Sequence, residues 1–194
     1  MIKETAIGLK RCAWVPGNDQ MYIKYHDEEW GVPVHDEAKL FEFLILEGAQ
    51  AGLSWKTILM KRDNFRLAFD HFDPAKVALY SDKKLIELQS NPGIIRNRLK
   101  ILSAVANANA FLEAQREYGN FDSYIWGFVG GTPIKNNWED VEQVPSRSPQ
   151  SDSMSRDLLK RGFKFVGSTI CYSFMQATGM VNDHTTDCFR HNEV

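Results

Sequence analysis

Apolar side chains recur at helical spacing along most of this chain. Between residues 36 and 47 they fall three and four positions apart and form one stripe: Leu40, Phe41, Leu44 and Ile45. Residues 55–69 repeat the pattern with Ile58, Leu59, Phe65 and Phe69. This spacing places the apolar residues on one face of an amphipathic helix. No stretch alternates cleanly as a half-buried strand does, so we expect an all-α fold of roughly seven or more short helices.

Capping and breaking signals divide the rest of the chain. Asp73 before Pro74 predicts a helix start, and Ser81 can cap a short helix that runs to residue 88. Asn-Pro-Gly at residues 91–93 ends that helix. Further helices are expected at residues 96–117, 155–162 and 166–180, the first burying Leu99, Leu102, Val105 and Ala106. Residues 130–155 are rich in proline and polar residues, which predicts a surface connection.

The composition suits one globular domain spanning residues 1–194. Hydrophobic residues make up 43% and charged residues 25% of the chain, so a disordered or fibrous protein is excluded. No run approaches the roughly 18 apolar residues that a membrane span needs, and residues 1–10 lack the apolar core of a signal peptide. We therefore expect a cytoplasmic protein. The formal net charge of -2 does not indicate a polyanionic partner, although local clusters can still bind one.

Four possible metal ligands lie near the two ends of the chain: Cys12, His26, His184 and Cys188. Two thiolates and two imidazoles form a closed tetrahedral set, which is typical of structural zinc and leaves no position for a reacting water. Cysteines and histidines also occur together by chance, and the first pair is spaced more widely than in zinc fingers. Spacing alone therefore leaves both interpretations open. Cys171 lies in an apolar run and is expected in the core.

Aromatic residues gather in the first part of the chain: Trp14, Tyr22, Tyr25, Trp30 and Trp55. Each one alone is typical of a core. Glu47 is more unusual, because it ends an amphipathic helix between apolar and aromatic residues, where Gly48 and Gly52 allow close backbone approach. A carboxylate among aromatic rings suits an organic cation. The alternative is a solvated glutamate at a helix end.

A Pro-Gly turn joins two helices in the segment NPGIIRNRLK. Backbone amides at the start of the second helix can bind a phosphate, and Arg96, Arg98 and Lys100 place positive charge beside them. A second basic cluster contains Lys160, Arg161 and Lys164. A basic first turn is also commonly a solvated face, so each cluster alone is a modest signal for a polyanion.

Together these segments closely resemble the 3-methyladenine DNA glycosylase I family of the helix-hairpin-helix superfamily, a family of bacterial enzymes. The resemblance runs from Arg11 to Cys188 in RCAWV, YIKYHDEEWGVP, LFEFLILEGAQAGLSW, FDPAKVA, GIIRNRLKI and KRGFKFVGSTICYSFMQATGMVNDH. It implies a helix-hairpin-helix near residues 81–117. It also implies that one structural Zn²⁺ ties residues 12–26 to residues 184–188, with Cys12, His26, His184 and Cys188 as ligands.

The resemblance also implies roles for single residues. Glu47 is expected to be catalytic and, with Tyr25, to hydrogen-bond the excised base, while Trp55 stacks on it and Trp14 and Tyr22 line the pocket. The residues expected to contact DNA are Gly52, Leu53, Gly93, Ile94, Ile95, Arg96 and Arg98. The sequence departs from the family at Ala49, where a larger polar residue is usual, and at residues 185–187 between two of the zinc ligands.

The implied activity is excision of 3-methyladenine from alkylated double-stranded DNA. The enzyme would turn the nucleotide out of the duplex, hydrolyse its bond to the sugar, and leave free base and an abasic site. The hairpin offers Ile95 and Arg96 and no lysine for a Schiff base, so strand cleavage is not expected. Asp122 is a candidate for an aspartate that related enzymes use, but lies outside the matching motifs. A monomer in the bacterial cytoplasm, associated with the nucleoid when bound to DNA, is expected.

Two rival functions have different requirements. A non-catalytic DNA-binding module would keep the hairpin and lose the pocket carboxylate, whereas Glu47 is present. A zinc hydrolase would need three protein ligands and an open coordination position, whereas four candidate ligands are present. The sequence disfavours both.

Overall fold

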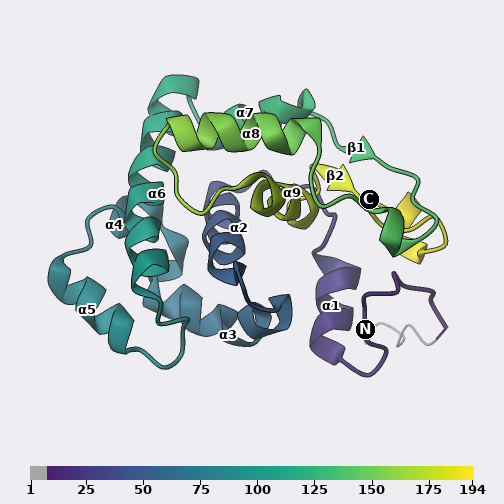
Figure 1. Ribbon diagram of the computed structural model, residues 1–194, viewed down its shortest axis with the longest axis horizontal. Helices are drawn as coiled ribbons and strands as arrows, with labels where there is room; N and C mark the ends of the chain where they lie inside the picture. Colours follow the sequence, from purple (N-terminus) through teal and green to yellow (C-terminus); the bar gives the residue numbers. More distant parts are fainter. Residues whose placement is uncertain (1–7) are drawn as a thin grey trace, which may run out of the picture.

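One buried helix, α2 (Glu37–Gln50), lies at the centre of the molecule. The computed structural model describes residues 8–194, and in that part α2 packs against α3 (Trp55–Ala68), α6 (Arg98–Tyr118), α7 (Phe121–Trp126) and α9 (Ser168–Ala177) (Figure 1). All ten residues from Leu40 to Ala49 are buried. The predicted apolar stripe is thus part of a helix that is enclosed on all sides over most of its length.

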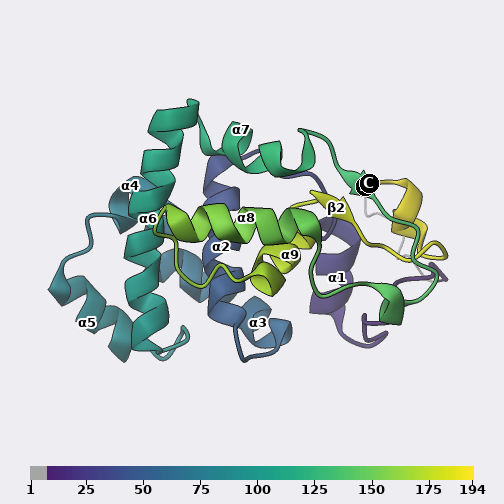
Figure 2. The ribbon, with the colours of Figure 1, turned by 45° about the horizontal axis from the view of Figure 1, so that its top comes forward.

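The remaining elements surround this centre. The other helices are α1 (Gln20–Glu28), α4 (Pro74–Val77), α5 (Asp82–Ser90) and α8 (Pro149–Lys160), with 3₁₀ turns at Asp70–Phe72, Gly127–Val129, Val141–Gln143 and Phe189–Asn192. The helix α8 packs against α9, and the two helices lie on the same side of the molecule (Figure 2). The prediction of a mostly helical fold is confirmed.

Most predicted helices are present, with shifted ends. The side chain of Asp73 accepts hydrogen bonds from the first turn of α4, and that of Ser81 caps α5, as their positions predict. The prediction missed α1 and α7. It also began α8 six residues late, since the structure starts this helix at Pro149, capped by Ser148. The sequence did contain a signal for this start, because proline is common at the first position of a helix. Pro149 was instead interpreted as part of the surface connection.

The predicted buried face of α6 is wrong. Leu99 is 65% exposed, and Leu102, Val105 and Ala106 are only partly buried. The helix instead buries a stripe of smaller residues with one aromatic ring: Ile101, Ala104, Ala108, Ala110, Phe111 and Ala114. Because this helix carries apolar residues on both faces, its sequence alone does not settle which face is buried. The alanine stripe is the one that permits close packing against α2 and α4.

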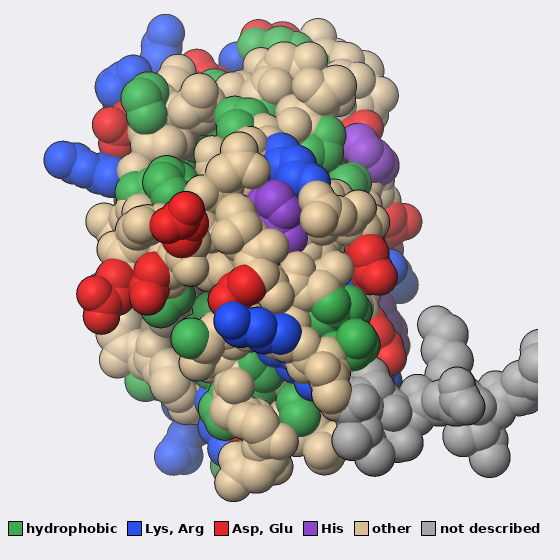
Figure 3. Space-filling model, turned by 90° about the vertical axis from the view of Figure 1, so that its right-hand side faces the viewer, with side chains coloured by type: hydrophobic (Ala, Val, Ile, Leu, Met, Phe, Trp, Pro, Cys, Tyr) green, Lys and Arg blue, Asp and Glu red, His purple; other side chains and the backbone are tan. Residues whose placement is uncertain are grey.

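The two ends of the chain meet on one side of the molecule. The amide of Phe189 donates to the carbonyl of Lys10 at 2.9 Å, and two short parallel strands pair there, β1 (Ile134–Lys135) with β2 (Val181–Asn182). The strands were not predicted, because two residues are too few to show alternation. Acidic and basic side chains are interspersed over this side and neither sign gathers (Figure 3).

None of the helices in residues 8–194 is long and apolar enough to cross a membrane. The expectation that residues 1–10 are no signal peptide falls mostly outside the described residues.

Candidate functional site

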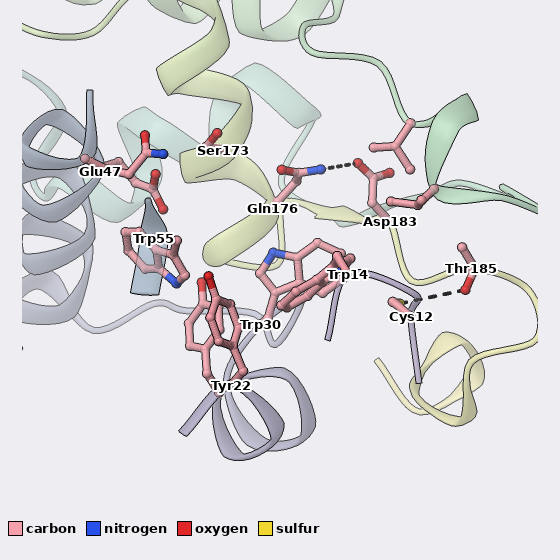
Figure 4. A pocket seen from close by; sticks show the side chains of 14 residues that line it. Cys12, Trp14, Tyr22, Trp30, Glu47, Trp55, Ser173, Gln176, Asp183 and Thr185 are labelled. Atoms are coloured by element: carbon pink, nitrogen blue, oxygen red, sulfur yellow. Dashed lines mark hydrogen bonds between the residues drawn. The ribbon is translucent and has the colours of Figure 1, made fainter. Parts of the chain in front are cut away.

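A cavity of about 340 Å³ opens between the C-terminal end of α2, the start of α3, α1 and α9 (Figure 4). All five residues predicted for the base pocket line it: Trp14, Tyr22, Tyr25, Glu47 and Trp55. The other lining residues are Cys12, Trp30, Gln50, Val141, Val144, Ser173, Gln176, Asp183 and Thr185. The structure therefore brings together residues from both ends of the chain at one site, which we call the pocket.

Glu47 lies in the last turn of α2 and reaches the pocket. Its side chain is almost wholly buried, and burial raises the pKa of its carboxyl group to about 8. The last turn of α2 contains no basic residue to offset the charge. Tyr25 is also buried, and burial, with a smaller effect from the nearby Glu47, raises its pKa well above the usual value. Both groups are thus held mainly in their neutral forms at neutral pH.

Aromatic rings form much of the pocket wall, with Glu47 at one end (Figure 4). The ring of Tyr25 lies 5.6 Å from that of Trp55, measured between centroids. Further along the pocket, Trp14 packs edge-to-face against Tyr22 at 5.9 Å and against Trp30 at 5.0 Å (Figure 4). The ring faces attract a flat organic cation, and Glu47 does so in its ionised form.

Asp183 holds the far wall of the pocket and was not predicted. Its carboxylate is 2% exposed and accepts four hydrogen bonds. Asn136 and Trp138 donate to Oδ1 at 2.7 and 2.8 Å, while Tyr172 and Gln176 donate to Oδ2 at 2.7 and 2.8 Å. These bonds join α9 to the segment that carries Val141 and Val144. That segment was predicted to be only a surface connection, whereas it contributes two pocket-lining residues.

Ser173 and Gln176 were also missed. They are polar residues three positions apart in the mostly apolar second half of α9, and both line the pocket. A signal for them was present in the sequence, because polar residues on one face of an apolar helix usually meet a cavity or a buried partner.

The four predicted metal ligands form one buried cluster. Sulfur and imidazole nitrogen atoms lie 3.5 Å apart in the pairs Cys12–His184 and Cys188–His184, and 3.4 Å apart in Cys188–His26. All four ligand atoms lie within 4.8 Å of one another. Ordinary zinc bond lengths place sulfur and nitrogen in one tetrahedron about 3.5 Å apart. The residues therefore fit a metal ion.

Both histidines of this cluster are oriented by partners outside it. Nδ1 of His26 lies 2.8 Å from Asp27, which also binds Arg11 at 2.6 Å, and Nε2 of His184 lies 3.1 Å from the carbonyl of Trp30. Each ring thus presents its other nitrogen to the cluster, as metal-binding histidines do. Hydrogen bonding, first from Cys12 and then from both imidazoles, lowers the pKa of the Cys188 thiol, which favours a thiolate ligand.

The hairpin (residues 91–97) joins α5 to α6, as predicted. Ile94 is buried, whereas Arg96 and Arg98 are exposed. The amides of Gly93 and Ile94 donate within the turn, to the side chain and carbonyl of Asn91. The amides of Ile95 and Arg96 have no acceptor among the described residues, so these are the ones that can meet a phosphate.

The predicted wedge lies in a turn between α2 and α3, which we call the wedge turn (residues 51–54). Gly52 adopts φ +77°, which favours glycine, and Leu53 is 38% exposed. Lys100 does not place its charge beside the hairpin as expected. Its ammonium instead donates to the carbonyls of Ala49 and Ala51.

Comparisons with known proteins agree with this geometry. The family described as methyladenine glycosylase matches residues 14–191. The chain belongs to this family. It is 48% identical to DNA-3-methyladenine glycosylase 1 of Escherichia coli K12 over 93% of this chain and 96% of that one. It is 47% identical to the DNA-3-methyladenine glycosylase of Haemophilus influenzae over 92% and 96% of the two chains.

Solved structures of the methyladenine glycosylase family superpose closely on this one. A crystal structure of 3-methyladenine DNA glycosylase I gives a TM-score of 0.90 at 50% identity, covering 93% of this chain and 98% of that one. The Staphylococcus aureus enzyme, in a structure on 3-methyladenine recognition, gives 0.90 at 35% identity over 93% and 96%. The family predicted from the sequence is confirmed, and the chain is a glycosylase by family. The arrangement of α5, hairpin and α6 fits the helix-hairpin-helix superfamily.

Positions that depart from the family pattern are accommodated locally. Ala49 is buried, and only its carbonyl takes part in a contact with Lys100. Thr185, between the metal ligands, donates to Asp187 at 2.8 Å and approaches the sulfur of Cys12 at 3.8 Å.

Two sequence candidates lie away from the pocket. Asp122 binds His35 at 2.9 Å and does not line the pocket. In the second basic cluster, Arg161 is bound to Asp157 at 2.7 Å and Glu117 at 2.6 Å, so its charge is already paired.

Proposed function

We propose that this protein excises 3-methyladenine from alkylated double-stranded DNA as a step of base excision repair. The single observation that carries the proposal is the buried carboxyl group of Glu47 in an aromatic pocket, at the end of the helix that leads to an exposed leucine. The two relatives described above, at 47% and 48% identity, are DNA-3-methyladenine glycosylases.

The pocket suits a cationic base. An adenine methylated at N3 carries a positive charge, which weakens its bond to the sugar. Trp55 stacks on the ring, Glu47 and Tyr25 hydrogen-bond its edge, and Trp14 and Tyr22 enclose it. Burial is the cause that raises the pKa of the Glu47 carboxyl group. The charged base supplies a cationic partner for this group, so it is preferred over neutral adenine, and water attacks the sugar as the base departs.

The base is reached by turning its nucleotide out of the duplex. Leu53 fills the vacated space and Gly52 lets the backbone approach the bases, while the hairpin from Gly93 to Arg96, with Arg98, binds phosphates. Extrusion costs roughly a few kcal/mol, and a damaged pair lowers that cost. The reaction leaves an intact abasic strand, because the hairpin presents no lysine and Lys100 is engaged with two carbonyls.

The cluster of Cys12, His26, His184 and Cys188 holds one structural Zn²⁺ in this proposal. The buried sulfur and nitrogen ligands suit zinc, and four of them leave no position for a reacting water. The ion would stabilise the fold by joining the two ends of a single domain. The enzyme acts as a monomer in the cytoplasm.

Measuring the base released from damaged DNA tests this function directly. Duplex DNA carrying one 3-methyladenine should yield free base and an abasic strand that stays intact until treated with alkali. A nicked strand without alkali would contradict the reaction without lyase activity.

The variant Glu47→Gln tests the residue that carries the proposal. It keeps the shape of the side chain and removes the charge that pairs with the cation. Base release should fall by at least about a hundredfold, the range typical for a positioned catalytic group, with an unchanged circular dichroism spectrum. Undiminished release would remove Glu47 from the reaction.

A further inference from the structure

Lys100 joins the hairpin to the end of α2. It lies in the first turn of α6, and its ammonium donates to the carbonyl of Ala49 at 2.8 Å and that of Ala51 at 2.6 Å. Its own amide donates to the side chain of Asn97, the last hairpin residue, at 3.1 Å. The final carbonyls of a helix have no partner within the helix. Lys100 supplies that partner from an element about fifty positions further along the chain.

The electrostatics of α2 make this contact more than a cap. The C-terminal end of a helix carries partial negative charge, and the last turn of α2 has no basic residue. That turn also contains Glu47. The ammonium of Lys100 therefore supplies the positive charge that the end of α2 lacks.

The contact also fixes the start of the wedge turn. Ala51, whose carbonyl Lys100 binds, directly precedes Gly52 and Leu53. The other end of this turn is held by Gln50, whose side-chain amide donates to the carbonyl of Leu53 at 2.9 Å. The position of Leu53 relative to the hairpin is therefore set in part by one ammonium group with two acceptors.

We propose that Lys100 is a positioning residue that sets the wedge turn relative to the DNA-binding hairpin, so that binding of the backbone phosphates places Leu53 at the lesion. This inference rests on the proposed function. Lys100 does not line the pocket, and its ammonium is engaged with two carbonyls.

The variant Lys100→Met tests the proposal by removing the ammonium and keeping the length of the side chain. Single-turnover release of 3-methyladenine from a fully paired duplex should fall by at least about tenfold, the size expected for losing hydrogen bonds from a charged donor. With the lesion in a mismatch, the loss should be smaller than about threefold, because a base that unstacks readily needs less help from a wedge. Lys100→Arg keeps the cation and should recover part of the paired-duplex rate.

A double-mutant cycle with Leu53→Ala shows whether Lys100 acts through the wedge. In the Leu53→Ala background, Lys100→Met should have little further effect on the paired duplex. Binding of free 3-methyladenine, followed by the fluorescence of the pocket tryptophans, should be unchanged in Lys100→Met. Full additivity of the two losses would overturn the proposal.

Lys61→Met is the matched control. Lys61, in α3, donates to the carbonyl of Pro92 in the hairpin at 2.9 Å, whereas Lys100 donates to carbonyls at the end of α2. Its loss should leave the ratio of rates on paired and mismatched DNA at the wild-type value. If Lys100→Met also leaves that ratio unchanged, the inference is wrong while the proposed function stands. If the wild-type protein releases no base from either duplex, both fail.

Discussion

At the scale of single residues, the pocket depends on a charge that is costly until a ligand arrives. Glu47 is 4% exposed, and the cause of its raised pKa is loss of contact with water. A cation in the pocket reverses that effect, since an adjacent opposite charge favours the carboxylate. One acid side chain can therefore separate a charged base from a neutral base of nearly the same shape.

The raised pKa predicts how stability depends on pH. Between the ordinary pKa of 4.5 and the raised pKa of about 8, the folded protein keeps a proton that the unfolded chain has released. The contribution of Glu47 to stability is therefore present below pH 4.5 and lost as the pH rises through 8, by at most about 5 kcal/mol. Urea unfolding at pH 5 and pH 8.5 should show Glu47→Gln gaining stability relative to the wild type at the higher pH. A constant difference between the two proteins would contradict this.

Asp183 predicts a different response to loss of charge. In Asp183→Asn one acceptor oxygen becomes a donor, so donors that now bind the carboxylate lose their acceptor in a buried site. We expect a loss of about 2–4 kcal/mol in the free energy of unfolding, together with weaker binding of 3-methyladenine as the wall carrying Val141 and Val144 loosens. Asp63→Asn is the control, because Asp63 is exposed and pairs only with Arg66 one turn further along α3. Equal stability of both variants would show that the four bonds contribute little.

At the scale of elements, the sequence predicts helices that have both a stripe and a cap. The helices α2, α3 and α5 have such signals, whereas α9 has an apolar run but begins after Gly167 without a side-chain cap. The short α7, of six residues, has too few positions for a period to show. The choice between the two apolar faces of α6 depends on what packs against it, which is tertiary information. The pocket residues found from the sequence belong to matching motifs. Asp183 lies in such a motif too, but its place in the pocket wall depends on Asn136 and Trp138, which only the fold brings to it.

The end of α9 predicts a sharp difference between two glycines. Gly179 adopts φ +71°, and a Cβ atom there would lie 2.4 Å from the backbone of Val32 and Pro33. Gly179→Ala should therefore lower the free energy of unfolding by at least about 3 kcal/mol. Gly127 has φ -55° and nothing within 4 Å of its Cβ position. Gly127→Ala should be neutral or stabilising by up to about 1 kcal/mol. Thermal unfolding of both variants measures the difference, and a tolerant Gly179 would mean that α9 and residues 32–33 can separate.

At the scale of the whole molecule, the metal cluster and the pocket share their walls. Trp30 packs edge-to-face against His184 at 4.6 Å, and Trp14 against His26 at 5.4 Å. Trp14 and Trp30 also line the pocket. The joined ends of the chain therefore support the aromatic walls around Glu47, although no cluster ligand needs to touch the base.

Removal of the proposed Zn²⁺ should therefore abolish activity through the fold. The substitution Cys12→Ser should lower Tm by about 10 °C or more, and so should treatment with a strong chelator. The reason is that the free energy of metal binding at a structural site contributes directly to the free energy of folding. Base release should decline in step with the folded fraction. Cys171→Ser is the matched control, since Cys171 is equally buried, donates to the carbonyl of Val166 and lies outside the cluster. It should keep its metal, measured by elemental analysis, and most of its activity. Loss of activity from a protein that stays fully folded without metal would contradict this prediction and assign the ion a part in the chemistry. Four protein ligands around one ion do not fit such a part, because they leave no coordination position for a reacting water.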